Sequence, residues 1–298
     1  MKYHNPVLLN ESVAGLDIIK DGIYVDVTFG GGGHSKEILK KLGHSGRLIA
    51  FDQDQDSIEN KIEDNRFLLI NKNFMYLKEN LLSNNIDKVD GILADFGISS
   101  HQIDVPERGF SIRYDADLDM RMDQNTELTA FDIVNSYSFD QLTKIFFEYG
   151  ELRMARVISA KIIEARLISE IKTTLELNEL LLTILPKKRS IKLLAQIYQA
   201  LRIEVNSELE VIKSFLIQSQ EVLKSKGRLS IISYHSLEDR LVKRFIRNGL
   251  FEGDAEKDLY GNVQIPFNKI GKLITPDESE IKQNNRARSA KLRIAEKN

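Results

Sequence analysis

The first hundred residues alternate between short apolar runs and segments with apolar positions at helical spacing. The expected strands are residues 23–27, 47–51, 67–70 and 89–94, and the expected helices between them are residues 35–42, 56–63 and 77–82. Strands that alternate with helices form a parallel sheet, and strands that are apolar on both faces are covered by helices on both sides. The pattern predicts an α/β fold with a doubly wound, mostly parallel sheet.

The pattern changes after Gln102. Residues 104–122 are rich in charged and turn-forming residues, and residues 129–201 place apolar positions at helical spacing without any strand candidate. Helical segments without strands do not extend a parallel sheet. Residues 104–201 are therefore expected to form a small helical domain inserted into the α/β chain.

The α/β pattern resumes in the last third of the chain. A helix expected to begin at Ser207 leads to a strand at residues 228–233, and a further helix is expected to begin at Ser236. Two late apolar runs, residues 272–275 and 290–294, are expected to pair as antiparallel strands. The predicted organisation is a first α/β part at residues 1–103, the helical insertion at residues 104–201, and a second α/β part at residues 202–298.

Composition narrows the class of protein. Of the 298 residues, 42% are hydrophobic and 29% are charged, which is typical of a folded globular chain and argues against intrinsic disorder. The absence of cysteine excludes disulfides, thiolate catalysis and cysteine-bound zinc, and the five histidines are scattered singly, so we expect no metal. With a net charge of −2, nucleic-acid binding would depend on local basic groups. No segment approaches the roughly 18 apolar residues of a membrane span, and no apolar signal region is found, so a cytoplasmic protein is expected.

Four consecutive glycines, Gly30 to Gly33, follow the first expected strand and precede the first expected helix. Glycines in this position let backbone N–H groups approach a ligand beside a helix N-terminus. Asp52 stands 22 residues after Gly30, at the end of the second strand, where a carboxylate can accept hydrogen bonds from both hydroxyls of a ribose. Together these features predict a ligand that contains adenosine.

Two residues bear on the identity of this ligand. A dinucleotide-binding loop would have glycine at position 35, where the chain has Ser35. Asp26, four residues before the glycines, is badly placed for a diphosphate and well placed for a cation. S-adenosylmethionine carries an ammonium and a sulfonium group and is therefore the expected cofactor. The alternatives are a nicotinamide cofactor, or a tight turn without a ligand in which Asp26 caps the helix.

Asp95 ends the fourth expected strand. Ligands of open α/β sheets bind beyond the carboxyl ends of the strands, so Asp95 and the loop after it are expected to face the reacting centre. A carboxylate there could orient an amine and later receive its proton, which makes Asp95 the candidate catalytic residue. The alternative is that Asp95 only caps the next turn.

Seven blocks of residues occur in order along the whole chain. They are Asp26-x-Thr-Phe-Gly-x-Gly-Gly-His-Ser35, Asp95-x-Gly-x-Ser-Ser100, Glu107-Arg-Gly-Phe-Ser111, Leu118-Asp-Met-Arg-Met-Asp123, Ala200-Leu-Arg-Ile-Glu-Val-Asn206, Ile231-Ile-Ser-Tyr-His-Ser-Leu-Glu-Asp-Arg240 and Arg286-Ala-Arg-Ser289. Together these blocks resemble the bacterial RsmH (MraW) family of methyltransferases.

The resemblance implies transfer of a methyl group from S-adenosylmethionine to the exocyclic N4 of a cytidine in the decoding centre of 16S ribosomal RNA, with the small ribosomal subunit as the partner. It also implies a Rossmann-like methyltransferase domain whose helical insertion recognises the substrate. The cofactor-binding residues that it implies are Gly32, Gly33, His34, Asp52, Phe74, Asp95 and Gln102.

The chain departs from the family beside the helical insertion. Ser99-Ser-His-Gln102 stands where the family usually has Ser-Ser-Pro-Gln. Gly150-Glu-Leu-Arg153 replaces the usual Gly-Glu-Glu-Arg, and Lys192-Leu-Leu-Ala-Gln196 replaces the usual His-Pro-Ala-Thr-Arg. These last two departures lie in or beside the helical insertion and bear on the docking of RNA more than on the cofactor. A base must leave its stack to expose N4, and the candidate aromatic platforms are Phe96, Phe110 and Tyr234. A methyltransferase of the same fold that acts on DNA or a small molecule, and a non-catalytic binding module with an adenosine pocket, are the alternatives.

Overall fold

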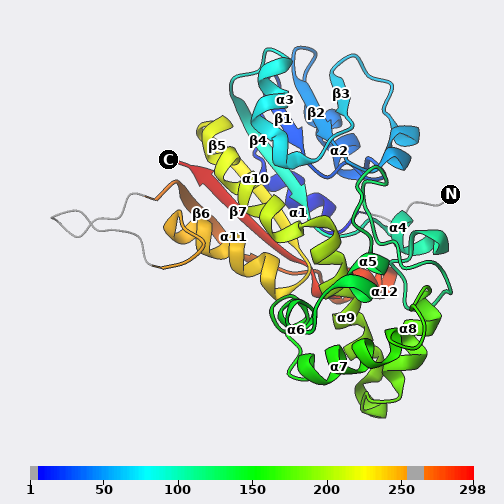
Figure 1. Ribbon diagram of the computed structural model, residues 1–298. Coiled ribbons are helices and arrows are strands. Elements are labelled where there is room, and N and C mark those ends of the chain that lie inside the picture. The colour runs from blue at the N-terminus through cyan, green and yellow to red at the C-terminus, as the bar shows by residue number, and fades with distance from the viewer. Residues whose placement is uncertain (1–5, 254–264) are drawn as a thin grey trace. The chain divides into compact units, whose positions relative to one another are not determined.

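The protein is described by a computed structural model that covers residues 6–253 and 265–298 (Figure 1). The chain forms two compact units, of which the first comprises Met1–Gly97 and Leu209–Asn298 and the second Ile98–Glu208. The second unit extends beyond the expected residues 104–201 at both ends. Helix α4 (Ser100–Asp104) belongs to it, and helix α9 (Ser190–Asn206) continues past residue 201 without a break.

The first unit is built on a seven-stranded sheet with the order β3-β2-β1-β4-β5-β7-β6. The strands are β1 (Ile23–Asp26), β2 (Arg47–Phe51), β3 (Phe67–Ile70), β4 (Val89–Asp95), β5 (Leu223–Ser233), β6 (Phe267–Ile274) and β7 (Lys291–Lys297). The first five strands are parallel, whereas β7 runs antiparallel between β5 and β6. The predicted mostly parallel sheet and the antiparallel pairing of the two late strands are confirmed.

Helices cover both faces of this sheet (Figure 1). The helices and 3-10 turns of the first unit are α1 (Leu9–Gly15), α2 (Gly33–Lys41), η1 (Gln55–Asn60), η2 (Phe74–Tyr76), α3 (Leu77–Ser83), α10 (Glu208–Val222), α11 (Ser236–Asn248), α12 (Glu278–Gln283) and η5 (Asn285–Ser289). Tyr24 and Leu48 pack with residues of α1 and α2, while the next residues along each strand, Val25 and Ile49, pack with α3, α10 and α11. This alternation is the two-residue period of a strand that is buried on both sides.

Two local expectations are wrong. Residues 56–63 do not form an α-helix, because the side chain of Asp54 accepts the N–H of Asp56 and Ser57 donates its hydroxyl to the Asp54 carbonyl, which favours the tighter 3-10 turn η1. The N-cap of α11 is His235 rather than Ser236, since the His235 ring accepts the Glu238 N–H in a capping box.

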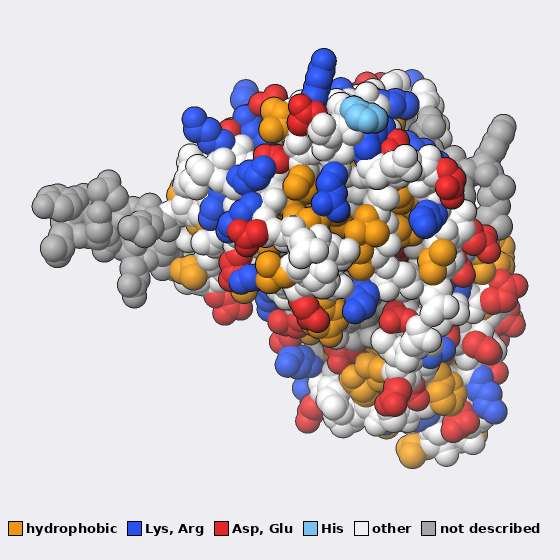
Figure 2. All heavy atoms as spheres, turned by 90° about the horizontal axis from the view of Figure 1, so that it is seen from above, with side chains coloured by type: hydrophobic (Ala, Val, Ile, Leu, Met, Phe, Trp, Pro, Cys, Tyr) orange, Lys and Arg blue, Asp and Glu red, His pale blue; other side chains and the backbone are white. Residues whose placement is uncertain are grey.

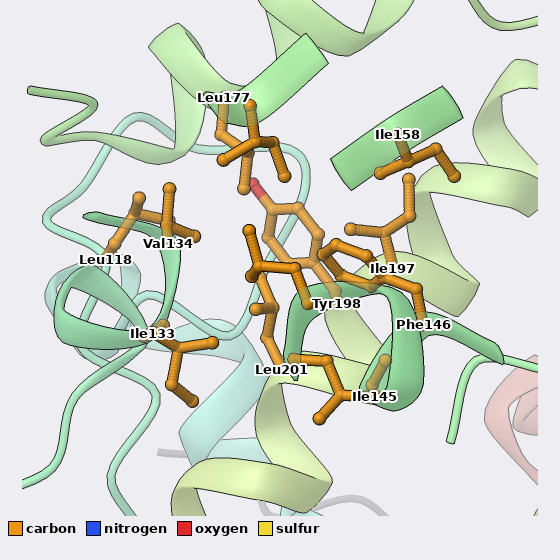
Figure 3. Packing of buried hydrophobic residues seen from close by; sticks show 14 of the residues in the cluster. Leu118, Ile133, Val134, Ile145, Phe146, Ile158, Leu177, Ile197, Tyr198 and Leu201 are labelled. Atoms are coloured by element: carbon orange, nitrogen blue, oxygen red, sulfur yellow. The ribbon is translucent and has the colours of Figure 1, made fainter. Parts of the chain in front are cut away.

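The second unit is helical. Its helices are α4, η3 (Pro106–Arg108), α5 (Ala130–Ser136), α6 (Phe139–Glu148), α7 (Ala155–Arg166), α8 (Thr174–Leu182), η4 (Lys187–Arg189) and α9. Tyr198 of α9 lies in the middle of their core, between Phe146 of α6 and Leu177 of α8 (Figure 3). Its hydroxyl donates to the carbonyl of Thr174, 3.2 Å away, so the buried polar atom is satisfied.

Three of the seven sequence blocks meet inside the second unit. Arg108 donates from Nη2 to the carbonyls of Arg121 and Met122, at 3.0 and 3.1 Å. Asn206 accepts the Met122 N–H at 2.7 Å and donates to the Met120 carbonyl at 2.8 Å. These contacts hold an irregular segment in one conformation, which is a structural role for the three blocks.

Candidate functional site

Three aspartates stand at the carboxyl edge of the parallel sheet. Asp26 and Asp95 are the last residues of β1 and β4, and Asp52 follows the last residue of β2. Strand β1 pairs with both β2 and β4, so the three residues come from adjacent strands. The charge of Asp26 contributes to raising the pKa of both other carboxyls. This edge therefore carries three coupled carboxyl groups.

The glycine loop connects β1 to α2. Gly30 and Gly32 have φ of +50° and +73°, in the left-handed region that favours glycine. Gly33 begins α2, and a Cβ atom there would lie 2.0 Å from Cγ of Pro6. The N–H of Gly30 donates to Oδ2 of Asp52 at 2.7 Å. Glycine is thus required at two positions by the backbone and at a third by close packing.

Asp26 is completely buried. Its Oδ1 accepts the Thr28 N–H at 3.1 Å, and its Oδ2 accepts the Ser35 hydroxyl at 2.7 Å. Burial raises the pKa of Asp26 to about 6. The sequence suggested that Asp26 attracts a cation. Because the Asp26 side chain is completely buried, it can attract a cation through its charge but cannot touch one.

Asp52 has room to accept further hydrogen bonds. Its Oδ2 accepts from Gly30, and its Oδ1 accepts the Asp54 N–H at 2.9 Å. Each carboxylate oxygen has a second lone pair, and the residue is partly exposed. Burial raises the pKa of Asp52 to about 7, while the two backbone hydrogen bonds oppose the shift. The side chain can therefore accept from the hydroxyls of a ribose.

Asp95 is held by partners from distant parts of the chain. The Tyr234 hydroxyl donates to Oδ1 at 2.8 Å, and Nδ1 of His34 lies 3.9 Å from Oδ2. The Asp95 N–H donates to Oγ1 of Thr28 at 2.7 Å, which fixes the end of β4. Burial raises the pKa of Asp95 to about 6, and the neighbouring His34 and Tyr234 lower it. The sequence suggested Tyr234 only as a stacking surface and missed this hydrogen bond.

The aromatic candidates differ in position. Phe96 is 3% exposed and lies in the core with Phe215, so it cannot receive a base as a platform. Phe110 is also buried, in the core of the second unit. Phe74 is partly exposed, stacks on Phe96 with ring centroids 6.0 Å apart, and contacts Phe215 edge-on. Of these three rings, Phe74 is the one that can offer a flat apolar surface to a ligand.

Gln102 lies in the second unit, on α4. Its side chain accepts the Ser99 N–H at 3.0 Å, and its own N–H donates to the Ser99 hydroxyl at 3.1 Å. These reciprocal bonds form a capping box that begins α4. The expected contact of Gln102 with the cofactor stays a prediction.

Basic side chains do not form one uninterrupted patch on the face seen in Figure 2, where they are interspersed with acidic and hydrophobic ones. Near the C-terminus, Lys291 and Arg293 both contact Asp239, at 3.3 and 2.7 Å, so the positive charge of these two residues is partly neutralised within the protein. In the described parts of the chain, no helix combines the length and apolar character needed to cross a bilayer.

Comparison with known proteins identifies the family. A model of the MraW methylase family matches residues 1–298. The chain belongs to this family. Proteins named "Ribosomal RNA small subunit methyltransferase H" are 63% identical in Flavobacterium johnsoniae, over 297 residues, and 52% identical in Bacteroides thetaiotaomicron, over 298 residues. Each alignment covers 100% of this chain and 98% of the relative. The resemblance inferred from the seven blocks is confirmed.

The cofactor of this methylase is S-adenosylmethionine, and the chemistry of the carboxyl edge fits it. A partly exposed carboxyl, Asp52, offers acceptors to a ribose, and Phe74 offers an apolar ring face. Three coupled carboxyls favour a ligand with positive charge and disfavour a diphosphate. The sulfonium and ammonium groups of S-adenosylmethionine supply that charge.

Proposed function

We propose that this methylase transfers a methyl group from S-adenosylmethionine to the exocyclic N4 of a cytidine in the decoding centre of 16S ribosomal RNA, within the small ribosomal subunit. The name of the relatives supports ribosomal RNA of the small subunit as the substrate. The family resemblance of the seven blocks supports cytidine N4. The observation that carries the chemistry is the carboxylate of Asp95 at the edge of the sheet, with Oδ1 held by the Tyr234 hydroxyl at 2.8 Å and Oδ2 at 3.9 Å from Nδ1 of His34.

The residues of the carboxyl edge would divide the work of binding the cofactor. Asp52 accepts from the ribose hydroxyls, Phe74 lies against the adenine, and Asp95 faces the methionine end. The backbone of Gly32 and Gly33 approaches the ligand, and its approach is possible because neither residue has a side chain. The remaining residues that the family resemblance assigns to the cofactor are His34 and Gln102.

Positioning dominates the proposed reaction. Methyl transfer is an in-line displacement, so N4, the methyl carbon and the sulfur must be collinear in a site that excludes water. The lone pair of N4 is conjugated with the cytosine ring and is weakly nucleophilic. Asp95 would accept a hydrogen bond from N4, localise the lone pair, and take the proton once the new C–N bond has formed.

The second unit would recognise the substrate. It is a separate helical body with its own core, and its short turn η4 carries three consecutive basic residues, Lys187, Lys188 and Arg189. Lysine and arginine side chains bind the phosphates of RNA and release counterions. We infer that this unit docks onto ribosomal RNA while the first unit performs the chemistry.

The test is transfer of labelled methyl from S-adenosylmethionine to small ribosomal subunits, naked 16S ribosomal RNA and duplex DNA, followed by nucleoside mass spectrometry. We expect N4-methylcytidine in the subunit. Label confined to DNA, or on another atom of the RNA, would contradict the proposed substrate.

A matched pair of variants tests Asp95. Asp95→Asn keeps the size of the side chain and removes its basicity, so the rate of transfer should fall about 100-fold or more. Asp87→Asn is the control, because Asp87 is exposed and precedes the opposite end of β4. Equal rates for both variants would remove Asp95 from the chemistry.

A further inference from the structure

The hydrogen-bond partner of one ring nitrogen of His34 fixes the protonation of that nitrogen. Nε2 lies 3.2 Å from the carbonyl oxygen of Val7, and both residues are buried. A carbonyl oxygen only accepts hydrogen bonds, so Nε2 must carry a proton for this contact to be favourable. The neutral form of His34 is therefore the Nε2–H tautomer, and a second proton can bind only at Nδ1.

Nδ1 of His34 faces the carboxylate of Asp95. The distance to Oδ2 is 3.9 Å, which suits an ion pair and is longer than a hydrogen bond. When His34 is neutral and Asp95 is ionised, two lone pairs face each other. A single proton placed on either atom turns this repulsion into attraction, so the two residues form a pair that holds one proton.

The other oxygen of Asp95 is already occupied. The Tyr234 hydroxyl donates to Oδ1 at 2.8 Å, and Tyr234 is itself positioned by its N–H, which donates to Oε2 of the buried Glu238 at 2.8 Å. A burial-raised pKa keeps the Tyr234 hydroxyl protonated, so this donor persists at neutral pH. Oδ2 is therefore the oxygen left to take a proton, and it is the one that faces His34.

The other ionisable groups around Asp95 are carboxyls. Asp26 approaches from β1 and Glu238 from α11, and both raise the pKa of Asp95, whereas His34 and the Tyr234 hydrogen bond lower it. For His34, burial lowers the pKa and the Asp95 carboxylate raises it. Among these neighbours, His34 is the group that can supply positive charge beside Asp95.

We propose that His34 is a positioning residue that acts through Asp95 and shares the proton that methyl transfer releases. This inference rests on the proposed function. As the methyl carbon bonds to N4, its bond to sulfur breaks and the electron pair stays on sulfur. The N4–H bond then breaks, and the proton moves to Oδ2 of Asp95. From there it is shared with Nδ1 of His34, which leaves an imidazolium beside a carboxylate. The proton returns to solvent after the products leave.

The first test needs no substrate. ¹⁵N NMR of the full chain with labelled histidine should show that Nε2 of His34 stays protonated while Nδ1 titrates. His34→Gln identifies the signals, and His44→Gln is the control because His44 is exposed on the turn between α2 and β2. Asp95→Asn should lower the pH at which Nδ1 titrates by about one pH unit or more, since it removes the facing negative charge.

Tyr234→Phe provides a variant with the opposite effect. Without the phenol hydrogen bond, Asp95 is more basic and the pair should take up its proton at higher pH. A protonated Nδ1 with a bare Nε2 in neutral His34, or an unchanged Nδ1 titration in both variants, would overturn the proposal.

The second test is the pH dependence of single-turnover methyl transfer. Glutamine at position 34 can still donate a hydrogen bond but cannot gain a proton. His34→Gln should therefore slow transfer at saturating cofactor by about tenfold, with a smaller change in KM for S-adenosylmethionine. The acid limb of the rate profile should also move to higher pH, because the imidazolium no longer lowers the pKa of Asp95. An acid limb at the same pH in His34→Gln as in the unchanged protein would refute the proposal that Asp95 and His34 share the proton.

The two proposals fail separately. The NMR titrations use the protein alone, so they report on the Asp95–His34 pair whatever RNA, DNA or small molecule is methylated. Expected titrations together with methylation of a different nucleotide would refute the proposed substrate and keep the pair. N4-methylcytidine on the ribosomal subunit, together with an Nδ1 titration that does not change in the variants, would support the proposed substrate and refute the Asp95–His34 pair.

Discussion

Alanine substitutions in the glycine loop between β1 and α2 meet three different obstacles. At Gly30 the backbone has φ of +50°, and an added Cβ meets nothing within 4 Å. At Gly32 φ is +73°, and the Cβ would come 2.9 Å from the Phe29 ring. At Gly33 φ is not in the left-handed region, but the Cβ would lie 2.0 Å from Cγ of Pro6. The series therefore separates backbone strain from steric contact.

The expected losses in the free energy of unfolding follow from these obstacles. A left-handed conformation costs an L residue about 1–2 kcal/mol, so Gly30→Ala should lose about 1 kcal/mol. Overpacking costs about 1–3 kcal/mol, and alanine recovers up to about 1 kcal/mol at a helical position, so Gly33→Ala should lose about 1–2 kcal/mol. Gly32→Ala combines strain and contact and should lose about 2–5 kcal/mol.

Urea unfolding followed by circular dichroism, without cofactor, measures all three variants. The dependence on urea should keep its slope, because the surface exposed on unfolding does not change. Equal losses for Gly30→Ala and Gly32→Ala would show that the Phe29 ring does not restrict the loop. A stable Gly33→Ala variant would show that Pro6 does not pack against α2.

Three further predictions concern the carboxyls and the helical core. Asp52→Asn should weaken the binding of S-adenosylmethionine about tenfold or more in calorimetric titration, since it removes an acceptor and a negative charge. Because burial raises the pKa of Asp26 to about 6, the native state holds this proton at a pH where the unfolded chain releases it, so stability should fall as pH rises from about 4 to 6. Asp26→Asn should flatten this slope in urea unfolding, by on the order of 3 kcal/mol over the window. Tyr198→Phe, which removes the hydrogen bond from its hydroxyl to the Thr174 carbonyl, should lose about 1 kcal/mol in the same assay.

The sheet could be predicted because its strands are local features of the sequence. The apolar runs at residues 47–51 and 67–70 coincide with β2 and β3, since each is short, apolar on both faces and bounded by polar turns. The wrong prediction of an α-helix at residues 56–63 has a local cause as well. There the side chain of Asp54 competes for backbone N–H groups and favours a 3-10 turn, which the spacing of apolar residues does not reveal.

The partners of the candidate site could not be predicted from local pattern. Asp95 and Tyr234 are 139 residues apart in the chain, and their hydrogen bond arises because β4 and β5 are neighbours in the sheet. The order of the strands is the feature that could have found it, since both residues stand at or just beyond the carboxyl ends of adjacent parallel strands. The contact of His34 with the Val7 carbonyl involves a segment for which the sequence pattern made no prediction.

Removing Asp26, Asp52 and Asp95 from much of the solvent at one edge of a sheet disfavours their charged forms, and their raised pKa values record this cost. A cation beside the three carboxyls offsets it, whereas a diphosphate would add to it. The sulfur of S-adenosylmethionine is positive before methyl transfer and neutral afterwards. The carboxyls therefore favour the reactant over the product. The three carboxyls thus attract S-adenosylmethionine, and they also favour release of the demethylated product, whose sulfur is neutral.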